Sequence, residues 1–161
     1  MAKTIEDSMV KESDLSEASR NSFLTQYAFE TFEDDPWTPA PDAKDRRVAI
    51  VSTAAIHAPD DRPFGYGAFH WRSFPSSQRN FLCSHNSVNW DRTGMYQDIN
   101  IAYPIDRLNE ACADGRIGSV ASTHYAFNGG TYEVAKYEPY AKEVAGLMKE
   151  DGVNTVLLCP V

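Results

Sequence analysis

Apolar residues follow two kinds of spacing along the chain, and their order predicts an α/β fold. Short apolar runs, RVAIVSTA from Arg47 and VLLC near the last residue, are typical of buried strands. Stripes at helical spacing occur between them, in PIDRLNEACADG and EPYAKEVAGLMKEDG. Because alternating strands and helices usually form parallel sheets with right-handed crossovers, we expect a mostly parallel, doubly wound (Rossmann-like) sheet with flanking helices.

The same patterns divide the chain into an extension and a core domain. A helix is predicted over residues 16–32, and DDPWTPAP, residues 34–41, is a proline-rich linker. The polar, acidic residues 1–15 are expected to be mobile. We therefore predict an acidic extension over residues 1–46 and an α/β domain over residues 47–161.

Turn-forming residues locate the remaining strands and loops of the core domain. Residues 56–76 are rich in Pro, Gly and aromatic residues, which favours a long loop, and a second strand is predicted over about residues 80–84. RIGSVASTHYAFNGG predicts a further strand and a glycine-rich turn. The final run VLLC is apolar on both faces, so we expect a helix from residues after Val161 to cover it.

Proline and glycine mark the ends of both core helices. Pro104 suits the first turn of one helix and Gly115 ends it, while Pro139 and Gly152 bound the other. Buried positions are predicted at Cys112 in the first helix and, in the second, at Tyr140, Val144, Leu147 and Met148.

Composition narrows the class of protein. The chain has 161 residues and a net charge of −8, without the basic stripe that binds nucleic acid. No apolar run is long enough to cross a membrane, and the N-terminus lacks the apolar core of a signal peptide. The three widely spaced cysteines form no disulfide framework. These features predict a cytoplasmic protein that binds neither nucleic acid nor membranes.

Cys159 is the first candidate for chemistry, because it lies at the end of the last predicted strand. In open α/β sheets, ligands bind beyond the carboxyl ends of strands. Pro160 follows, and a helix beginning there would present its positive N-terminus and favour the reactive thiolate. The alternative is that Cys159 is a small buried apolar residue.

Histidines and carboxylates supply candidate acid–base groups. His85 and His124 could act as general bases near pH 7, with Asp91 or Asp98 orienting an imidazole. The alternative for each histidine is a hydrogen-bonded structural role. The spacings match no zinc signature such as H-E-x-x-H, so no metal site is predicted.

Small polar residues follow two of the predicted strands. Ser52 and Thr53 would let a ligand approach the backbone closely, and Asn128 precedes two glycines that form a turn or an anion-binding nest. Neither G-x-G-x-x-G nor a P-loop is present, so nucleotide binding has no support and no cofactor is expected on this chain.

Four blocks, in order, carry a family resemblance: RVAIVSTAAIHAPDDRPF, SHNSVNWDRTGMYQDINIAYPIDRL, GRIGSVASTHYAFNG and KEDGVNTVLLCPV. They resemble the selenoprotein B family of glycine, sarcosine, betaine and D-proline reductases. The second block, which holds His85, Asp98 and the run PIDRL, is the most specific. The resemblance runs from Arg47 to Val161. No counterpart of residues 1–46 is recognised in the family.

The resemblance implies a selenocysteine. In that family the strand corresponding to VLLC leads into this residue, in one member within a Cys-x-x-selenocysteine pair. Cys159 matches the cysteine of the pair, so the selenocysteine would directly follow Val161. Selenocysteine is encoded by UGA, which is commonly read as a stop. The resemblance therefore implies the N-terminal part of a longer selenoprotein, and a chain that is inactive by itself.

The resemblance also implies a reaction and partners. These enzymes reductively cleave a C–N bond of an amino acid or its N-methyl derivative. A pyruvoyl group on a partner subunit engages the substrate amine, and the selenolate displaces nitrogen from the α-carbon. Cys159 would be the resolving thiol, and a thiol or dithiol donor would reduce the pair. A hetero-oligomer follows, with His85 and Asp98 expected to line the pocket.

Two other classes of function stay open from the sequence. A cofactor-free amino-acid racemase or isomerase uses two cysteines as acid and base, and Cys83 could face Cys159 in that role. A non-catalytic, truncated subunit would only bind a partner through its aromatic loop and N-terminal helix.

Overall fold

The computed structural model describes residues 12–26, 38–87, 90–130 and 133–161. By its internal contacts the chain divides into two compact units, residues 1–36 and 37–161. Three predicted features lie partly outside the described residues: the mobile N-terminal segment, the second half of the first helix and the start of the linker.

The first unit contains the predicted N-terminal helix. A short 3₁₀ helix, η2 (Glu12–Asp14), precedes α1 (Glu17–Gln26). The hydroxyl oxygen of Ser16 accepts a hydrogen bond from the Ser19 N–H at 3.1 Å, which is the usual way for serine to cap a helix. The helix prediction is confirmed over the part that is described.

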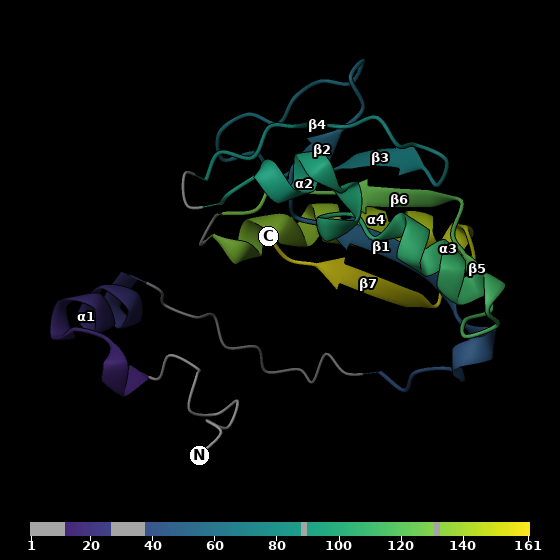
Figure 1. Cartoon of the computed structure of the whole chain (residues 1–161), viewed down its shortest axis with the longest axis horizontal. Helices are drawn as coiled ribbons and strands as arrows, with labels where there is room; N and C mark the ends of the chain where they lie inside the picture. The colour runs from purple at the N-terminus through teal and green to yellow at the C-terminus, as the bar shows by residue number, and fades with distance from the viewer. Residues whose placement is uncertain (1–11, 27–37, 88–89, 131–132) are drawn as a thin grey trace. The chain divides into compact units, whose positions relative to one another are not determined.

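β1 (Arg47–Ser52) lies inside the main sheet and has parallel neighbours on both edges (Figure 1). β7 (Thr155–Cys159) pairs with it over five positions along one edge. β5 (Ser119–Val120) and β6 (Thr123–Ala126) share the other edge, one after the other. β3 (Arg72–Pro75) then pairs with β6 in the antiparallel direction. The sheet is therefore mixed.

The mixed sheet corrects part of the fold prediction. The α/β class is confirmed, but the mostly parallel, doubly wound sheet is not, because β3 runs antiparallel beside β6. β3 lies inside the predicted loop of residues 56–76, where its sequence RSFP has only Phe74 buried. Such a short, one-sided strand leaves no apolar run in the sequence.

Two more short strands form a separate antiparallel pair. β2 (Ile56–His57) pairs with β4 (Leu82–Cys83). β4 confirms the strand predicted near residues 80–84, although it joins β2 rather than the main sheet. The predicted long loop thus begins and ends with strand residues.

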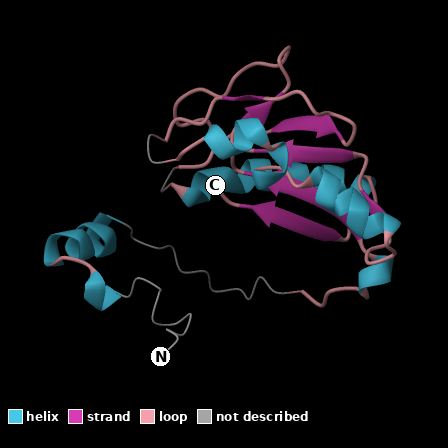
Figure 2. Ribbon diagram, viewed as in Figure 1, coloured by secondary structure: helices cyan, strands magenta, loops and turns pink. Residues whose placement is uncertain are grey.

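Successive residues of β1 face opposite helical layers, and Figure 2 shows helices on both faces of the sheet. Val48 and Ile50 pack in one core with residues of α3 (Ile105–Ala113). Ala49 packs in a second core with residues of α4 (Glu138–Glu150). The connections contain the short helices η3 (Ala43–Asp45), α2 (Thr93–Gln97), η4 (Ile99–Ile101) and η5 (Val134–Tyr137).

The predicted ends of the two core helices agree with the structure better than the predicted buried positions do. Gly115 and Gly152 follow α3 and α4 with φ of 71° and 68°, as C′ glycines should. Pro104 is the N-cap of α3 rather than a residue of its first turn. Three predicted core positions are wrong: Leu147 is 37% exposed, and Cys112 and Tyr140 are only half-buried.

β7 is an edge strand among the strands that the structure describes, and its apolar residues are exposed. Val156, Leu157 and Leu158 are 42%, 38% and 68% exposed, although the run VLLC predicts a buried strand. Pairing with β1 satisfies one edge of β7, but no helix of the described residues covers its apolar side chains enough to bury them.

The side chain of His124, in β6, forms a hydrogen bond with the backbone of β1. Its Nδ1 accepts a hydrogen bond from the Ile50 N–H of β1 at 2.9 Å, so the proton of the neutral ring is on Nε2. The side chain is fully buried, and its ring lies edge-on to Tyr103 with 5.4 Å between centroids. Burial lowers the pKa of His124 from 6.5 to about 4.

This pKa shift predicts acid sensitivity. Between pH 6.5 and about 4 the unfolded chain binds a proton at His124 that the folded chain does not, so stability is complete above pH 6.5 and falls below it. We expect His124 to contribute a loss of about 3 kcal/mol in unfolding free energy across this window. In His124→Gln, whose amide oxygen can accept from Ile50, the loss should shrink. Urea unfolding between pH 7 and 4 measures both; an equally steep loss in the variant contradicts the assignment.

Candidate functional site

The carboxyl ends of three parallel strands meet at Thr53, which directly follows β1. The Thr53 N–H donates to the Cys159 carbonyl at the end of β7 (3.1 Å), and the Thr53 carbonyl accepts from the Gly129 N–H after β6 (2.8 Å). The Thr53 hydroxyl oxygen accepts from the Val161 N–H at 2.9 Å. Thr53 therefore lies where the sequence predicts it and holds the segments that follow β6 and β7.

A cavity of about 340 Å³ opens beside this junction. Its wall is formed by Thr53, Phe127, Gly129, Gly130, Val134, Tyr137, Ala141 and Val161. Tyr137 donates its hydroxyl to the Asn128 carbonyl, and its ring packs edge-on against Phe127 at 5.7 Å between centroids. Sequence reasoning missed Phe127 and Tyr137, and the only signal for them is an aromatic residue at a strand end and another just before a helix.

Gly129 is the tightest point of the site. A β-carbon there would lie 3.0 Å from the Thr53 carbonyl oxygen, 3.1 Å from His85 Nε2 and 3.1 Å from the Val161 carbonyl oxygen. Three segments that are distant in sequence thus close around one backbone position. The neighbouring Gly130 has a φ of +78°, a left-handed conformation that favours glycine, and the residues that would complete the predicted turn lie outside those described.

His85 reaches the same junction from the loop that follows β4. It is 5% exposed, and its Nδ1 accepts a hydrogen bond from the Ser87 N–H at 3.1 Å, which leaves the proton on Nε2. Burial, and then the charge of Arg92, lower the pKa of His85. Among the described residues, Nε2 has no hydrogen-bond partner. The site therefore contains a neutral imidazole with an N–H donor that no described residue uses.

The carboxylates predicted to orient a histidine are engaged elsewhere. Asp91 accepts from the Thr93 N–H at 2.9 Å, and Asp98 accepts from the Asn100 N–H at 2.9 Å. Hydrogen bonds from the side chain and then the backbone N–H of Thr93 lower the pKa of Asp91, and those of Asn100 lower the pKa of Asp98; both carboxyl groups are exposed. Within the described part of the chain, His85 forms no hydrogen bond with either carboxylate. Asp98 is instead the N-cap of η4, and Asp91 binds the first N–H of α2 from the position before its N-cap, Arg92.

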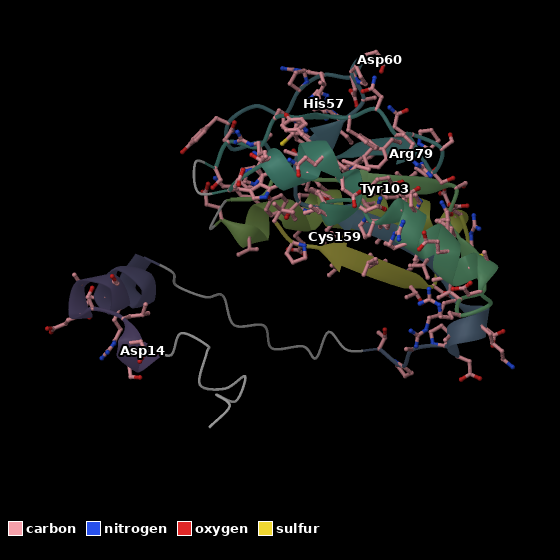
Figure 3. All side chains as sticks on the ribbon, viewed as in Figure 1. Asp14, His57, Asp60, Arg79, Tyr103 and Cys159 are labelled. Atoms are coloured by element: carbon pink, nitrogen blue, oxygen red, sulfur yellow. The ribbon has the colours of Figure 1, made fainter. Side chains whose placement is uncertain are left out.

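Cys159 ends β7 with its backbone in the junction and its side chain half-buried (Figure 3). The thiol packs against the core on the α3 side of the sheet and does not line the cavity. Burial raises the pKa of Cys159. In this structure the group is therefore a thiol at neutral pH, and not the thiolate that a following helix would favour.

Of the other predicted site residues, Asn128 and Ser52 lie next to the junction, and His124 lies inside the sheet. Asn128 is 3% exposed and has a buried Oδ1 without a partner among the described residues. Ser52 uses its hydroxyl oxygen to accept from the Ala54 N–H at 3.2 Å, which stabilises the turn after β1. His124 lies inside the sheet and away from the cavity wall, which favours a structural role.

The described residues also bear on metals and membranes. Within the described ranges, no three His, Cys, Asp or Glu side chains come together as a set of metal ligands. None of the helices described there has the length and apolar character needed to span a bilayer.

The tight packing around Gly129 predicts that alanine substitutions at two glycines will change the unfolding free energy in opposite directions. Gly129→Ala should lower the unfolding free energy by about 1–3 kcal/mol, because backbone and imidazole atoms would have to move. Gly146→Ala in α4, where a β-carbon meets nothing within 4 Å, should raise it by about 0.5–1 kcal/mol. Urea unfolding of both variants checks this; equal stability of the two would contradict the junction described here.

Comparison with known proteins places these residues in a family. The model for glycine/sarcosine/betaine reductase selenoprotein B matches residues 14–160, so the match also covers most of the extension that the sequence analysis could not place. D-proline reductase subunit gamma of Acetoanaerobium sticklandii is 34% identical over 127 residues, which are 76% of this chain and 52% of that protein.

A second relative is more distant. The sarcosine reductase complex component B subunit beta of Peptoclostridium acidaminophilum is 27% identical over 146 residues, which are 84% of this chain and 33% of that protein. No solved structure matches the chain. The chain spans about half the length of the first relative and a third of the second. It belongs to the glycine/sarcosine/betaine reductase selenoprotein B family.

Proposed function

We propose that the chain forms part of a subunit of an amino-acid reductase complex, which reductively cleaves a C–N bond in a substrate of the D-proline, glycine, betaine or sarcosine class. The observation that carries this proposal is the family match over residues 14–160, together with the position of Cys159 at the carboxyl end of β7. Strand ends are where open α/β folds bind ligands. The two relatives are named as subunits of reductases for D-proline and sarcosine.

Within this proposal Cys159 is the redox partner of a selenocysteine that directly follows Val161. That residue would supply a nucleophile that is largely anionic at neutral pH. The residues present fit such a group: Thr53 fixes the backbone of Val161, and His85 offers an unused N–H beside it. Cleavage of the C–N bond consumes two electrons, which the sulfur–selenium pair provides by becoming oxidised, and a thiol or dithiol donor then reduces the pair.

Burial suits Cys159 to the second role in such a pair. A raised pKa keeps it protonated at neutral pH, so it does not compete with the more acidic selenol as the nucleophile. Its side chain lies outside the cavity wall, which leaves the cavity to the substrate. The thiol therefore reacts after the selenolate has displaced nitrogen and formed a selenium–carbon bond. Its sulfur then bonds to the selenium, and the carbon leaves with the selenium–carbon electron pair and takes up a proton.

The proposal includes the rest of the assembly. A partner subunit carries the pyruvoyl group that engages the substrate amine, and the complex is a hetero-oligomer of the cytoplasm. The chain binds no cofactor of its own in this account.

The nucleotide sequence after codon 161 tests the proposal directly. We expect an in-frame UGA followed by a reading frame similar to the remainder of the relatives. The 161-residue chain mixed with the pyruvoyl subunit and a dithiol should then show no turnover. An ordinary stop codon without a continuing frame, or turnover by the short chain, refutes the selenocysteine account.

The role of Cys159 predicts a split between first and later turnovers. In the selenium-containing protein, Cys159→Ser should allow one substrate equivalent to react but lower steady-state turnover by about tenfold or more. Cys112→Ser, which changes a half-buried thiol of α3, is the matched control and should keep the normal rate. Rapid-quench and steady-state assays measure both phases. An unchanged steady-state rate in Cys159→Ser would show that this thiol has no redox role.

A further inference from the structure

His85 holds a hydrogen-bond donor that the fold has buried without using. The imidazole is 5% exposed, and Nε2 has no partner among the described residues. Leaving a buried N–H unpaired costs about 1–3 kcal/mol, so a fold keeps such a group only where something else offsets the cost. The packing around the ring, with Trp90 edge-on at 5.1 Å between centroids, leaves it little freedom to turn away.

Nε2 of His85 lies close to the place where the chain continues from β7. A β-carbon built on Gly129 would lie 3.1 Å from His85 Nε2 and 3.1 Å from the Val161 carbonyl oxygen, so both atoms approach the same backbone position. Thr53 fixes Val161 there through the 2.9 Å bond to its N–H. A residue after Val161 would therefore begin near Nε2.

We infer that His85 is a positioning residue that donates its Nε2–H to the selenium of the residue following Val161, and so orients that atom and stabilises its anionic form. The inference rests on the proposed function, because it needs a selenocysteine at this place. It assigns His85 a hydrogen bond to the reactive atom in place of the general-base role considered from the sequence.

Two sets of hydrogen bonds and a neighbouring glycine suit His85 to donating a hydrogen bond rather than to proton transfer. The Ser87 N–H occupies Nδ1 at 3.1 Å, which fixes the proton on Nε2. Arg92 donates to the His85 and Ser87 carbonyl oxygens, so the loop is held and a positive charge lies close to the ring. Gly129 has no side chain, so no β-carbon crowds Nε2 at the 3.1 Å that one would take there. A neutral donor in a buried site lowers the energy of an anion without giving up its proton.

The test uses the full-length protein with its selenium content established first by mass spectrometry. The pH dependence of alkylation by iodoacetamide gives the pKa of the selenol, which requires neither substrate nor partner subunit. We expect His85→Phe to raise this pKa by about one unit, a tenfold loss of anion at a given pH below it. His85→Gln, whose amide can place an N–H near Nε2, should restore most of the shift. His57→Gln, at a buried histidine that donates to the Ala58 carbonyl, is the control and should leave the pKa unchanged.

The outcomes separate this inference from the proposed function. A raised pKa in His85→Phe with recovery in His85→Gln supports the hydrogen bond to selenium. If selenium is present, the variants are folded by circular dichroism and all pKa values agree, the inference is wrong while the proposed function stands. If the full-length protein contains no selenium, the proposed function fails and this inference fails with it.

Discussion

The parallel pairing of β7 with β1 determines the positions of Thr53, Cys159 and Val161 in the candidate site. Five residue pairs fix the register, so Cys159 lies opposite Ser52 at the end of both strands. Thr53, the next residue after β1, continues this hydrogen bonding in both directions. On the β7 side its N–H donates to the Cys159 carbonyl and its hydroxyl accepts from the Val161 N–H, and on the β6 side its carbonyl accepts from the Gly129 N–H. A shift of one residue in β7 would turn its side chains to the opposite faces and would separate Cys159 from the junction.

Burial, more than nearby charge, sets the protonation states around the junction. It raises the pKa of Cys159 and is the largest cause of the lowered pKa values of His85 and His124. All three groups are therefore neutral near pH 7. Two of them have separate roles. His124 Nδ1 accepts the Ile50 N–H of β1 in place of a backbone carbonyl, and Cys159 supplies a protonated thiol for the proposed chemistry. The third, His85, presents an N–H where an anion is expected.

The sequence predicted those parts of the structure that depend on local chemistry. Strand β1, helices α3 and α4 and their C-terminal glycines follow from apolar spacing and turn residues. The antiparallel strand β3 could not be predicted, because its pairing with β6 is a tertiary contact and RSFP carries no strand pattern. For the same reason the site was only partly predicted. Residue types identified Thr53, His85 and Cys159. The hydrogen bonds of Asp91 and Asp98 at the starts of α2 and η4, and the aromatic wall of Phe127 and Tyr137, depend on distances that the sequence does not contain.

The central claim is that Cys159 works with a selenocysteine next to this junction. Peptide mass spectrometry on the full-length protein, quenched with an alkylating agent after reaction with substrate and partner subunit but without dithiol, tests it most directly. The account predicts a peptide in which the sulfur of Cys159 is bonded to selenium, and the loss of that bond when dithiol is added. Complete alkylation of Cys159 under the same conditions, with substrate consumed, would contradict it.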